Sequence, residues 1–575
     1  MPHQLSHPIP AAWGRVCGGV RGAVARVGFG LWALHTGVGA PAAWAQEGDP
    51  LRHSDRAASL YRDVLKVDGT GNPLLPLSVL ARQERVDVAA AGGVRVLGTG
   101  DGAVEVRTPG PVEVTVTEPK SGVFEWFVVL GEAAAHDFDA LRAAKAAWKE
   151  RGVPLRLMGS GTTYSLAGRA FDTRVSRLCF DETLRSEAAA RARAEELGKK
   201  WGADFNVHVV VAEPPGGRLI ARGPGGAEVR AADVLWFEGI REAGKGAAVQ
   251  VTGSRKGART VLDLPGRVYM VPAQNGGIEV INEAEIERIL EGVVASEIFH
   301  SAPDAALQSQ AIAARTDMLA KVGTRHATDP FAICSDVHCQ AYSGLERVNP
   351  RIAEAVRSTR GLVMIDADGR LVDAYYHAIS GGHTENNENA WPGRPQPALR
   401  GRPDLVAAQA PGAPALTTDA GVDALLASKD VSWAAASGMN IDNSRWHTER
   451  SGDDLRQSLQ AYGIAKKVVG LRVLRRGVSG RALEVEIAHP AGEKSVLAGE
   501  LRIRKGLGGS AGPKGLRSAL FVVKQDGDKF VFRGAGFGHG VGMDQTGAVG
   551  RAKAGQRSTA ILQAYYSGVR IEKVY

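Results

Sequence analysis

Residues 282–297 read Asn-Glu-Ala-Glu-Ile-Glu-Arg-Ile-Leu-Glu-Gly-Val-Val-Ala-Ser-Glu and predict an amphipathic helix. Asn282 followed by Glu285 is typical of a capping box, and the apolar residues Ile286, Ile289, Leu290, Val293 and Val294 then recur at helical spacing. Glu297 continues this apolar stripe, so we expect its carboxylate to be partly dehydrated. Dehydration raises the pKa of a carboxyl group toward neutrality, where it can donate a proton and later accept one. The alternative is a helix-end glutamate that reaches water.

A second helix is predicted directly after the first, so that the helical pair covers residues 283–322. Ser301 and Pro303 mark its start and Gly323 its end. Arg315 lies among small residues on this helix, and a guanidinium in such a place needs an anion. The anion is either a neighbouring carboxylate, which makes the arginine structural, or a charged group of a substrate.

Four stretches are similar, in the same order, to motifs of the SpoIID/LytB family, whose characterised members are peptidoglycan lytic transglycosylases or enhancers of wall amidases. These stretches are Glu291–Glu297, Gln310–Thr316, Ser380–Asn386 and Gly538–Ala548. The resemblance covers about Gly253 to Tyr575, a little over half of the chain. It implies an α+β fold and a catalytic acid at the position of Glu297.

The chain departs from the family pattern at three places. Ile298-Phe299 stands where Met-Pro is frequent, Asp317 where a tyrosine is common, and Asp544 where a serine is common. None of these changes removes the acid. The changes at Asp317 and Asp544 are expected to alter the substrate groove, so the resemblance bears more on the reaction class than on the substrate.

One well-placed glutamate is compatible with a lytic transglycosylase, whereas most glycosidases use two carboxylates. A single residue protonates the glycosidic oxygen and then, as a carboxylate, takes the proton of the sugar's own C6 hydroxyl. The resemblance implies a 1,6-anhydro-muramyl product. The glycine-rich turns are expected to let the polymer approach the backbone. The expected substrate contacts are Arg315, His377, Ser380, Gly381, Gly382, Thr384, His539 and Gln545, and for the histidines a purely structural role is the alternative.

Cysteine and histidine residues cluster between residues 326 and 339. His326, Cys334, His338 and Cys339 form a set that suits tetrahedral zinc, and their short spacing favours a closed structural site. A Cys334–Cys339 disulfide and free thiols are the alternatives. The His-Glu-x-x-His motif of zinc peptidases is absent from the sequence.

Composition places the chain among globular proteins of several domains. It has 575 residues, 44% hydrophobic and 23% charged, and a net charge of +8 from 70 basic and 62 acidic residues. Because the basic residues are spread along the chain, a nucleic-acid partner is not indicated.

The domain organisation is expected to begin with a secretory signal peptide at residues 1–45, because arginines and no acidic residue precede an apolar stretch and Ala43-Trp44-Ala45. A membrane anchor is the alternative; otherwise no integral membrane segment is expected in the mature chain, which would be exported to the periplasm or cell envelope. The expected parts that follow are a polar tether (46–76), a short β-rich segment (77–118), a split-βαβ module (122–213) and a SpoIID-like domain (214–575) with a linker-like stretch (392–415). The split-βαβ module is faintly similar to glycan-binding SPOR domains, and an anonymous α+β module is the alternative.

The sequence therefore predicts an exported peptidoglycan lytic transglycosylase with Glu297 as general acid and base and a structural zinc. One alternative is a non-catalytic peptidoglycan binder that enhances a cell-wall amidase. Another is a zinc hydrolase, in which removal of the metal would abolish turnover.

Overall fold

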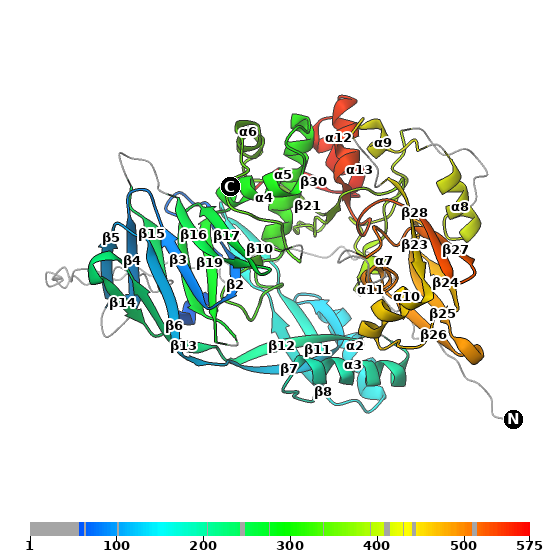
Figure 1. The fold of residues 1–575 in the computed structure, drawn as a ribbon, viewed down its shortest axis with the longest axis horizontal. Coiled ribbons are helices and arrows are strands. Elements are labelled where there is room, and N and C mark those ends of the chain that lie inside the picture. The colour runs from blue at the N-terminus through cyan, green and yellow to red at the C-terminus, as the bar shows by residue number, and fades with distance from the viewer. Residues whose placement is uncertain are drawn as a thin grey trace, which may run out of the picture.

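The computed structural model describes residues 57–575, apart from residues 62–64, 100–102, 204, 242–247, 275, 337, 392, 407–414, 429, 440–443 and 509–514. The expected signal peptide at 1–45 and most of the expected tether lie outside the described residues. Figure 1 shows a β-sandwich on the left, helices at the top centre, an α+β module below them and a second β-rich part on the right. This mixture of helices and strands confirms the α+β class.

The β-sandwich consists of two sheets whose inner faces share one hydrophobic core, and their strands pair antiparallel except for β20, which is parallel to β2. The first sheet has the order β1-β2-β19-β18-β15-β4-β5, with β20 beside β2, and the second has the order β14-β13-β6-β3-β16-β17. The strands of the first sheet are β1 (Lys66–Val67), β2 (Pro73–Gln83), β4 (Val94–Thr99), β5 (Ala103–Thr108), β15 (Leu235–Gly239), β18 (Arg267–Pro272), β19 (Ile278–Glu285) and β20 (Ile333–Cys334). The strands of the second are β3 (Arg85–Ala89), β6 (Val112–Lys120), β13 (Gly216–Arg222), β14 (Glu228–Ala231), β16 (Val249–Arg255) and β17 (Ala258–Leu264).

The sandwich differs from the expected sequence of separate parts. Strands from the expected β-rich segment pair with strands from beyond residue 213, for example Leu97 opposite Trp236. Strand β2 begins inside the expected tether, and Leu75 is buried opposite Ala284 of β19. The physical reason is that a short β-rich segment cannot bury its apolar face alone and completes its sheets with strands from after the inserted module.

The inserted module has the expected βαββαβ order of elements. Its sheet has the order β12-β7-β11-β8, and helices α2 and α3 share an apolar core with it. The elements are β7 (Val123–Ala134), α2 (Phe138–Glu150), β8 (Leu155–Ser160), β11 (Val175–Phe180), α3 (Glu187–Trp201) and β12 (Asn206–Glu213). A hairpin of β9 (Thr163–Leu166) and β10 (Arg169–Asp172) leaves this sheet, and the Tyr164 hydroxyl donates to Leu319 O at 2.9 Å. The hairpin thus anchors the module to the helices above it.

The helical pair follows the sandwich directly. Helix α4 (Ile286–Glu297) continues from β19, and α5 (Asp304–Ala320) packs against it and against α6 (Pro350–Ser358). The expected capping box is wrong: Asn282 lies within β19, and its side chain donates to Pro265 O at 2.7 Å. Because the strand continues to Glu285, the amide of Asn282 bonds across the sheet and cannot cap the helix.

The C-terminal part packs two three-stranded sheets, two two-stranded sheets and several helices around further cores. Its strands are β21 (Leu362–Ile365), β22 (Tyr376–His377), β23 (Arg445–Ser451), β24 (Gly470–Arg476), β25 (Ala482–Ala488), β26 (Lys494–Ala498), β27 (Phe521–Asp526), β28 (Lys529–Ala535), β29 (Met543–Asp544) and β30 (Arg570–Lys573). Its helices are α7 (Asn387–Ala390), α8 (Asp419–Ala427), α9 (Trp433–Ala436), α10 (Gly452–Leu459), α11 (Glu500–Gly506), α12 (Gln545–Lys553) and α13 (Ser558–Tyr565). The described part of the expected linker 392–415 includes Leu399 and Asp404, both 1% exposed, so this stretch is packed into the domain.

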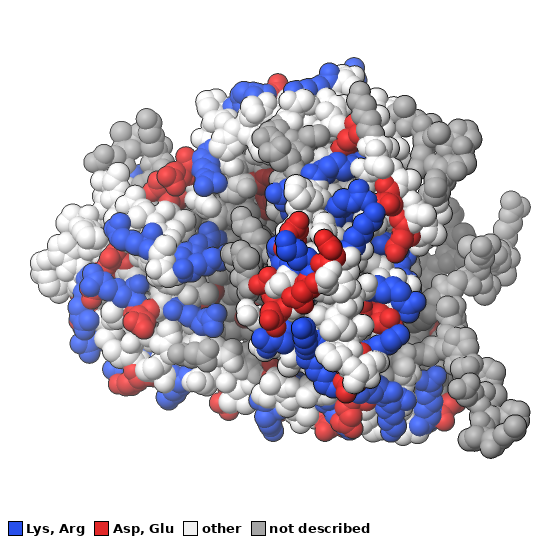
Figure 2. All heavy atoms as spheres, turned by 45° about the vertical axis from the view of Figure 1, so that its right-hand side comes forward, with Lys and Arg blue, Asp and Glu red and all other residues white. Residues whose placement is uncertain are grey.

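The surface carries charges of both signs. Over the face drawn in Figure 2, Lys and Arg side chains alternate with Asp and Glu. Many of them form exposed ion pairs such as Arg156–Asp181 and Arg472–Glu486. Among the described residues, no helix combines the length and the apolar character needed to cross a membrane.

Candidate active site beside a Cys/His cluster

Glu297 is the last residue of α4, and its side chain is partly buried. The residues one turn earlier, Val293 and Val294, are fully buried, so the carboxylate lies at the end of the apolar stripe. Its Oε1 accepts a hydrogen bond from Ala341 N at 2.7 Å. Burial raises the pKa of Glu297, and the charge of Asp317 acts in the same direction, against the Ala341 N–H and the charge of Lys321. The side chain is therefore biased toward the protonated form that a general acid needs.

A network of buried polar groups surrounds this acid. Lys321, the C-cap residue of α5, donates from Nζ to Asp317 Oδ2 at 2.5 Å. The amide of Gln340 also donates to Asp317, and the Tyr376 hydroxyl donates to Gln340. Asp317 is thus already occupied by a cation and an amide. Sequence analysis did not identify Lys321, Gln340 and Tyr376 as part of this site, although Gln340 directly follows Cys339 of the Cys/His cluster.

The C-terminal motif reaches the end of α4. Gln545 Nε2 donates to the backbone carbonyl of Glu297 at 2.9 Å and lies 3.2 Å from Gln310 Oε1. Asp544 accepts from Gly547 N at 2.7 Å as the N-cap of α12 and from Ser380 N at 2.6 Å. Gln545 therefore fixes the position of the acid, while Asp544 joins the two glycine-rich turns.

The glycines of the two turns serve chain packing. Gly381 has a φ of 81°, and a Cβ there would lie 3.0 Å from Ala535 C. At Gly536, with a φ of 76°, a Cβ would lie 2.7 Å from Ile379 O. The missing side chains thus let the turns approach each other, which differs from the expected approach of a polymer. Gly382 also has a positive φ, of 110°.

Burial favours the neutral form of the two histidines of the site. Burial lowers the pKa of His377 well below its ordinary value and that of His539 to about 3. His377 Nδ1 lies 3.1 Å from Val541 O, and its buried Nε2 has no hydrogen-bond partner among the described residues. The His539 ring centroid lies 4.7 Å from that of Trp391, which in turn lies 4.7 Å from that of Tyr375. His539 thus belongs to a group of aromatic rings, and the buried His377 lies beside it, with ring centroids 5.5 Å apart.

Three expected substrate contacts are occupied inside the protein. Arg315 is fully buried, and its guanidinium donates to both carboxylate oxygens of Glu287, at 2.8 and 2.7 Å. Ser380 and Thr384 are also buried, and their hydroxyls contact Asp404 and the carbonyl of Arg402. The expectation of a substrate-binding Arg315 is therefore wrong, because a charged side chain without access to water pairs with a buried carboxylate.

The Cys/His cluster brings together the four residues that the sequence singled out. The ligand atoms of His326, Cys334, His338 and Cys339 lie within 4.8 Å of one another. His326 Nε2 lies 3.3 Å from Cys339 Sγ, and His338 Nδ1 lies 3.7 and 3.6 Å from the two sulfur atoms. Metal–ligand bonds of about 2.0–2.3 Å give tetrahedral edges of roughly 3.3–3.8 Å. The donor set and its spacing therefore fit zinc.

One further contact supports this assignment of donor atoms. His326 Nδ1 lies 2.8 Å from Asp329 Oδ2, which orients the ring with Nε2 toward the sulfurs, as outer-shell carboxylates do in zinc sites. The cysteine thiols are not joined as a disulfide. Gln340 and Ala341 directly follow Cys339, so the cluster holds the segment whose backbone N–H bonds to Glu297.

The fold thus places Glu297, at the end of helix α4, between the Cys/His loop and the two glycine-rich turns. Residues 274–365 match the SpoIID family, described as stage II sporulation protein, and residues 385–542 match a family described as a domain of unknown function. This SpoIID domain confirms the resemblance to the SpoIID/LytB family that the sequence indicated.

The chain is also similar over part of its length to several other proteins. The chain is similar to the stage II sporulation protein D of Bacillus subtilis, with 25% identity over 59% of this chain and 90% of the relative. It is 29% identical to the amidase enhancer of Bacillus subtilis over 49% of this chain and 40% of the relative. An uncharacterized protein of Brachyspira hyodysenteriae is 26% identical over 53% of this chain and 71% of the relative.

Proposed function

We propose that this protein is an exported peptidoglycan lytic transglycosylase in which Glu297 is the general acid and base. The observation that carries the proposal is the environment of Glu297: a partly buried carboxyl group, with a raised pKa and an oxygen fixed by Ala341 N–H, at the end of a rigid helix. The SpoIID domain and the sporulation and amidase-enhancer relatives support a role at the cell wall.

The single carboxyl group favours a non-hydrolytic reaction. The carboxyl proton passes to the glycosidic oxygen as the C1–O bond breaks. The resulting carboxylate then takes the proton of the C6 hydroxyl while the C6 oxygen of the sugar bonds to C1. The acid is thereby regenerated and no water is consumed. Asp317 contributes to the pKa of Glu297, but its ion pair with Lys321 and its bond to Gln340 leave it poorly suited to activate water.

The Cys/His cluster is proposed to hold a structural zinc ion. His326, Cys334, His338 and Cys339 supply a closed set of ligands, so the metal would contribute stability to the loop rather than a Lewis acid to the reaction. The same loop places Ala341 N–H against Glu297. Removal of the metal should therefore act through the stability and position of this segment.

The test uses purified sacculi, either intact or stripped of stem peptides, followed by mass spectrometry of the released fragments. Anhydro-muramyl ends are expected with the natural chain and not with Glu297→Gln. Water-derived reducing ends in place of anhydro ends would overturn the proposal. A metal chelator should lower the unfolding temperature, whereas a zinc hydrolase would lose turnover on chelation and retain it in Glu297→Gln.

A second candidate function is a non-catalytic enhancer of a cell-wall amidase, which the similarity to the amidase enhancer favours. In that case no glycan fragments appear, the added amidase is accelerated, and Glu297→Gln accelerates it as well as the natural chain does.

A further inference from the structure

A pocket of about 250 Å³ lies where several distant parts of the chain meet. Its walls come from Tyr61 near the N-terminus, from Phe124 and Pro215 at the two ends of the inserted module, and from β18 and β19. The segment Thr328–Phe331 of the Cys/His loop closes it. Residues that contact the Glu297 carboxylate do not line this pocket, so it is separate from the candidate active site.

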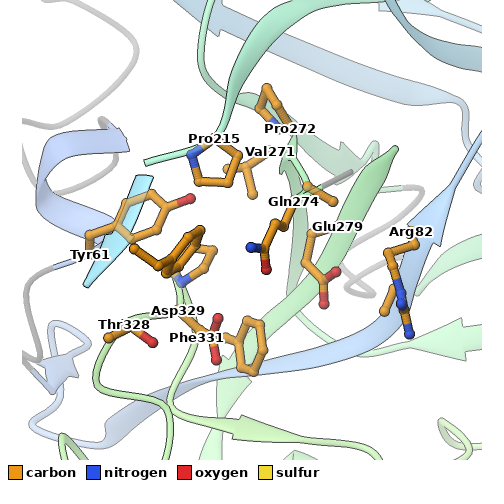
Figure 3. Close-up of a pocket in the computed structure, with 14 residues that line it drawn as sticks. Tyr61, Arg82, Pro215, Val271, Pro272, Gln274, Glu279, Thr328, Asp329 and Phe331 are labelled. Carbon is orange, nitrogen blue, oxygen red and sulfur yellow. The ribbon is translucent and has the colours of Figure 1, made fainter. Parts of the chain in front are cut away.

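Glu279 is the distinctive group of the pocket. Figure 3 shows its side chain in the space between Gln274 and Phe331. The hydroxyl of Ser78 donates to Oε1, and the ion pairs of the described residues do not include Glu279. Burial raises the pKa of Glu279 to about 7, and the nearby charge of Asp329 adds to this effect. The charge of His326 and a hydrogen bond from the Arg82 backbone act in the opposite direction. Among the described residues, however, no ion pair compensates this half-buried carboxylate, and a cationic ligand would stabilise it.

The other walls suit a cation. The rings of Tyr61, Phe124 and Phe331 line the pocket, and the face of an aromatic ring attracts a positive charge. Arg82 is the one basic side chain among the lining residues described; it is exposed, and Figure 3 shows its guanidinium directed away from Tyr61 and Gln274. The second carboxylate, Asp329, is held by His326 at 2.8 Å and adds negative potential.

We propose that this pocket binds a ligand carrying a primary ammonium group, with Glu279 as its counter-ion and the rings of Tyr61 and Phe331 beside the cation. The small volume admits a group of the size of an amino acid side chain or a small amine and excludes a glycan strand. The ammonium group comes either from a free small amine or from a side chain of a peptide. The proposal does not depend on the reaction assigned to Glu297.

The test is calorimetric titration of the full chain with pentylamine and with its neutral analogue 1-pentanol. Pentylamine is expected to bind saturably and at least about tenfold more tightly than the alcohol. The alcohol has the lower affinity because it cannot form the desolvated charge pair with Glu279. Glu279→Gln, which keeps the acceptor for Ser78, should weaken amine binding about tenfold or more. Glu493→Gln, at an exposed ion pair with Lys466, is the matched control and should leave it unchanged.

A thermal melt confirms that each variant is folded, and Tyr61→Leu provides a second variant that removes a ring and should weaken amine binding severalfold. N-acetyl-alanyl-lysine amide then distinguishes the two sources of the ammonium group. Displacement of pentylamine by this peptide, and not by its ε-acetylated form, indicates the side chain of a peptide. No displacement by the peptide indicates a free small amine. Equal affinity for the amine and the alcohol, unchanged affinity in Glu279→Gln, or the absence of saturable amine binding would each overturn the proposal.

Discussion

Replacement of Arg315 by methionine separates a structural role of this arginine from a role in substrate binding. The guanidinium is fully buried, donates to both oxygens of Glu287 and also donates to Leu362 O at 3.0 Å. Its charge and hydrogen bonds hold the pKa of Glu287 below the ordinary value, although burial alone would raise it. Methionine keeps much of the volume of the arginine side chain but leaves the buried carboxylate of Glu287 without its cation. Loss of one partner of a buried pair costs about 3–5 kcal/mol, and we expect that loss in the free energy of unfolding.

The assay is denaturant unfolding, combined with binding of the folded fraction to sacculi. Glu287→Gln with Arg315→Met removes both charges, and this double variant should recover a substantial part of the stability lost by Arg315→Met alone. Retention of sacculus binding by the folded protein is expected. An Arg315→Met protein with the stability of the natural chain and a lost affinity for sacculi would refute the structural interpretation.

The remaining predictions concern the metal, a tight turn and pH. Cys334→Ser should lose bound zinc, measured by mass spectrometry of metals, and should unfold at a lower temperature. The control is Cys179→Ala, which removes a buried thiol outside the cluster and should keep its zinc. Equal zinc contents in the two variants would contradict the proposed site. Gly540→Ala should cost more stability than Gly568→Ala. Both glycines have positive φ, but only at Gly540 would a Cβ meet the buried guanidinium of Arg481, at 2.2 Å from its Cζ. Equal losses of stability in urea unfolding would argue against this packing. The proposed transglycosylase activity should decline as pH rises through the raised pKa of Glu297, which must be protonated to act as the acid. A rate that keeps rising with pH would exclude this role.

The local part of the site could be predicted from the sequence. The apolar stripe that ends at Glu297 follows from helical periodicity, and Cys334, His338 and Cys339 lie within six residues, so their proximity follows from the chain itself. The structure places both features as the residue patterns indicated, the glutamate at a partly buried helix end and these three donors in one cluster with His326.

The long-range part could not be predicted from the sequence. Ala341 N–H and Gln545 meet Glu297 across 44 and 248 residues of chain, and periodicity carries no signal for such contacts. The same limit applies to Arg315, since the sequence showed that it needs an anion without indicating that Glu287 supplies it. The strands before and after the inserted module likewise gave no local sign that they share two sheets.

The central claim is tested most directly by the glycan products of Glu297→Gln compared with those of the natural chain. A raised pKa in the folded state means that a glutamate here adds stability at pH values below its unfolded pKa and loses that contribution as pH rises through the folded pKa. At neutral pH the glutamine variant should therefore be at least as stable as the natural chain. We expect a folded variant that releases no anhydro-muramyl fragments from sacculi, and undiminished release would contradict a catalytic role of Glu297.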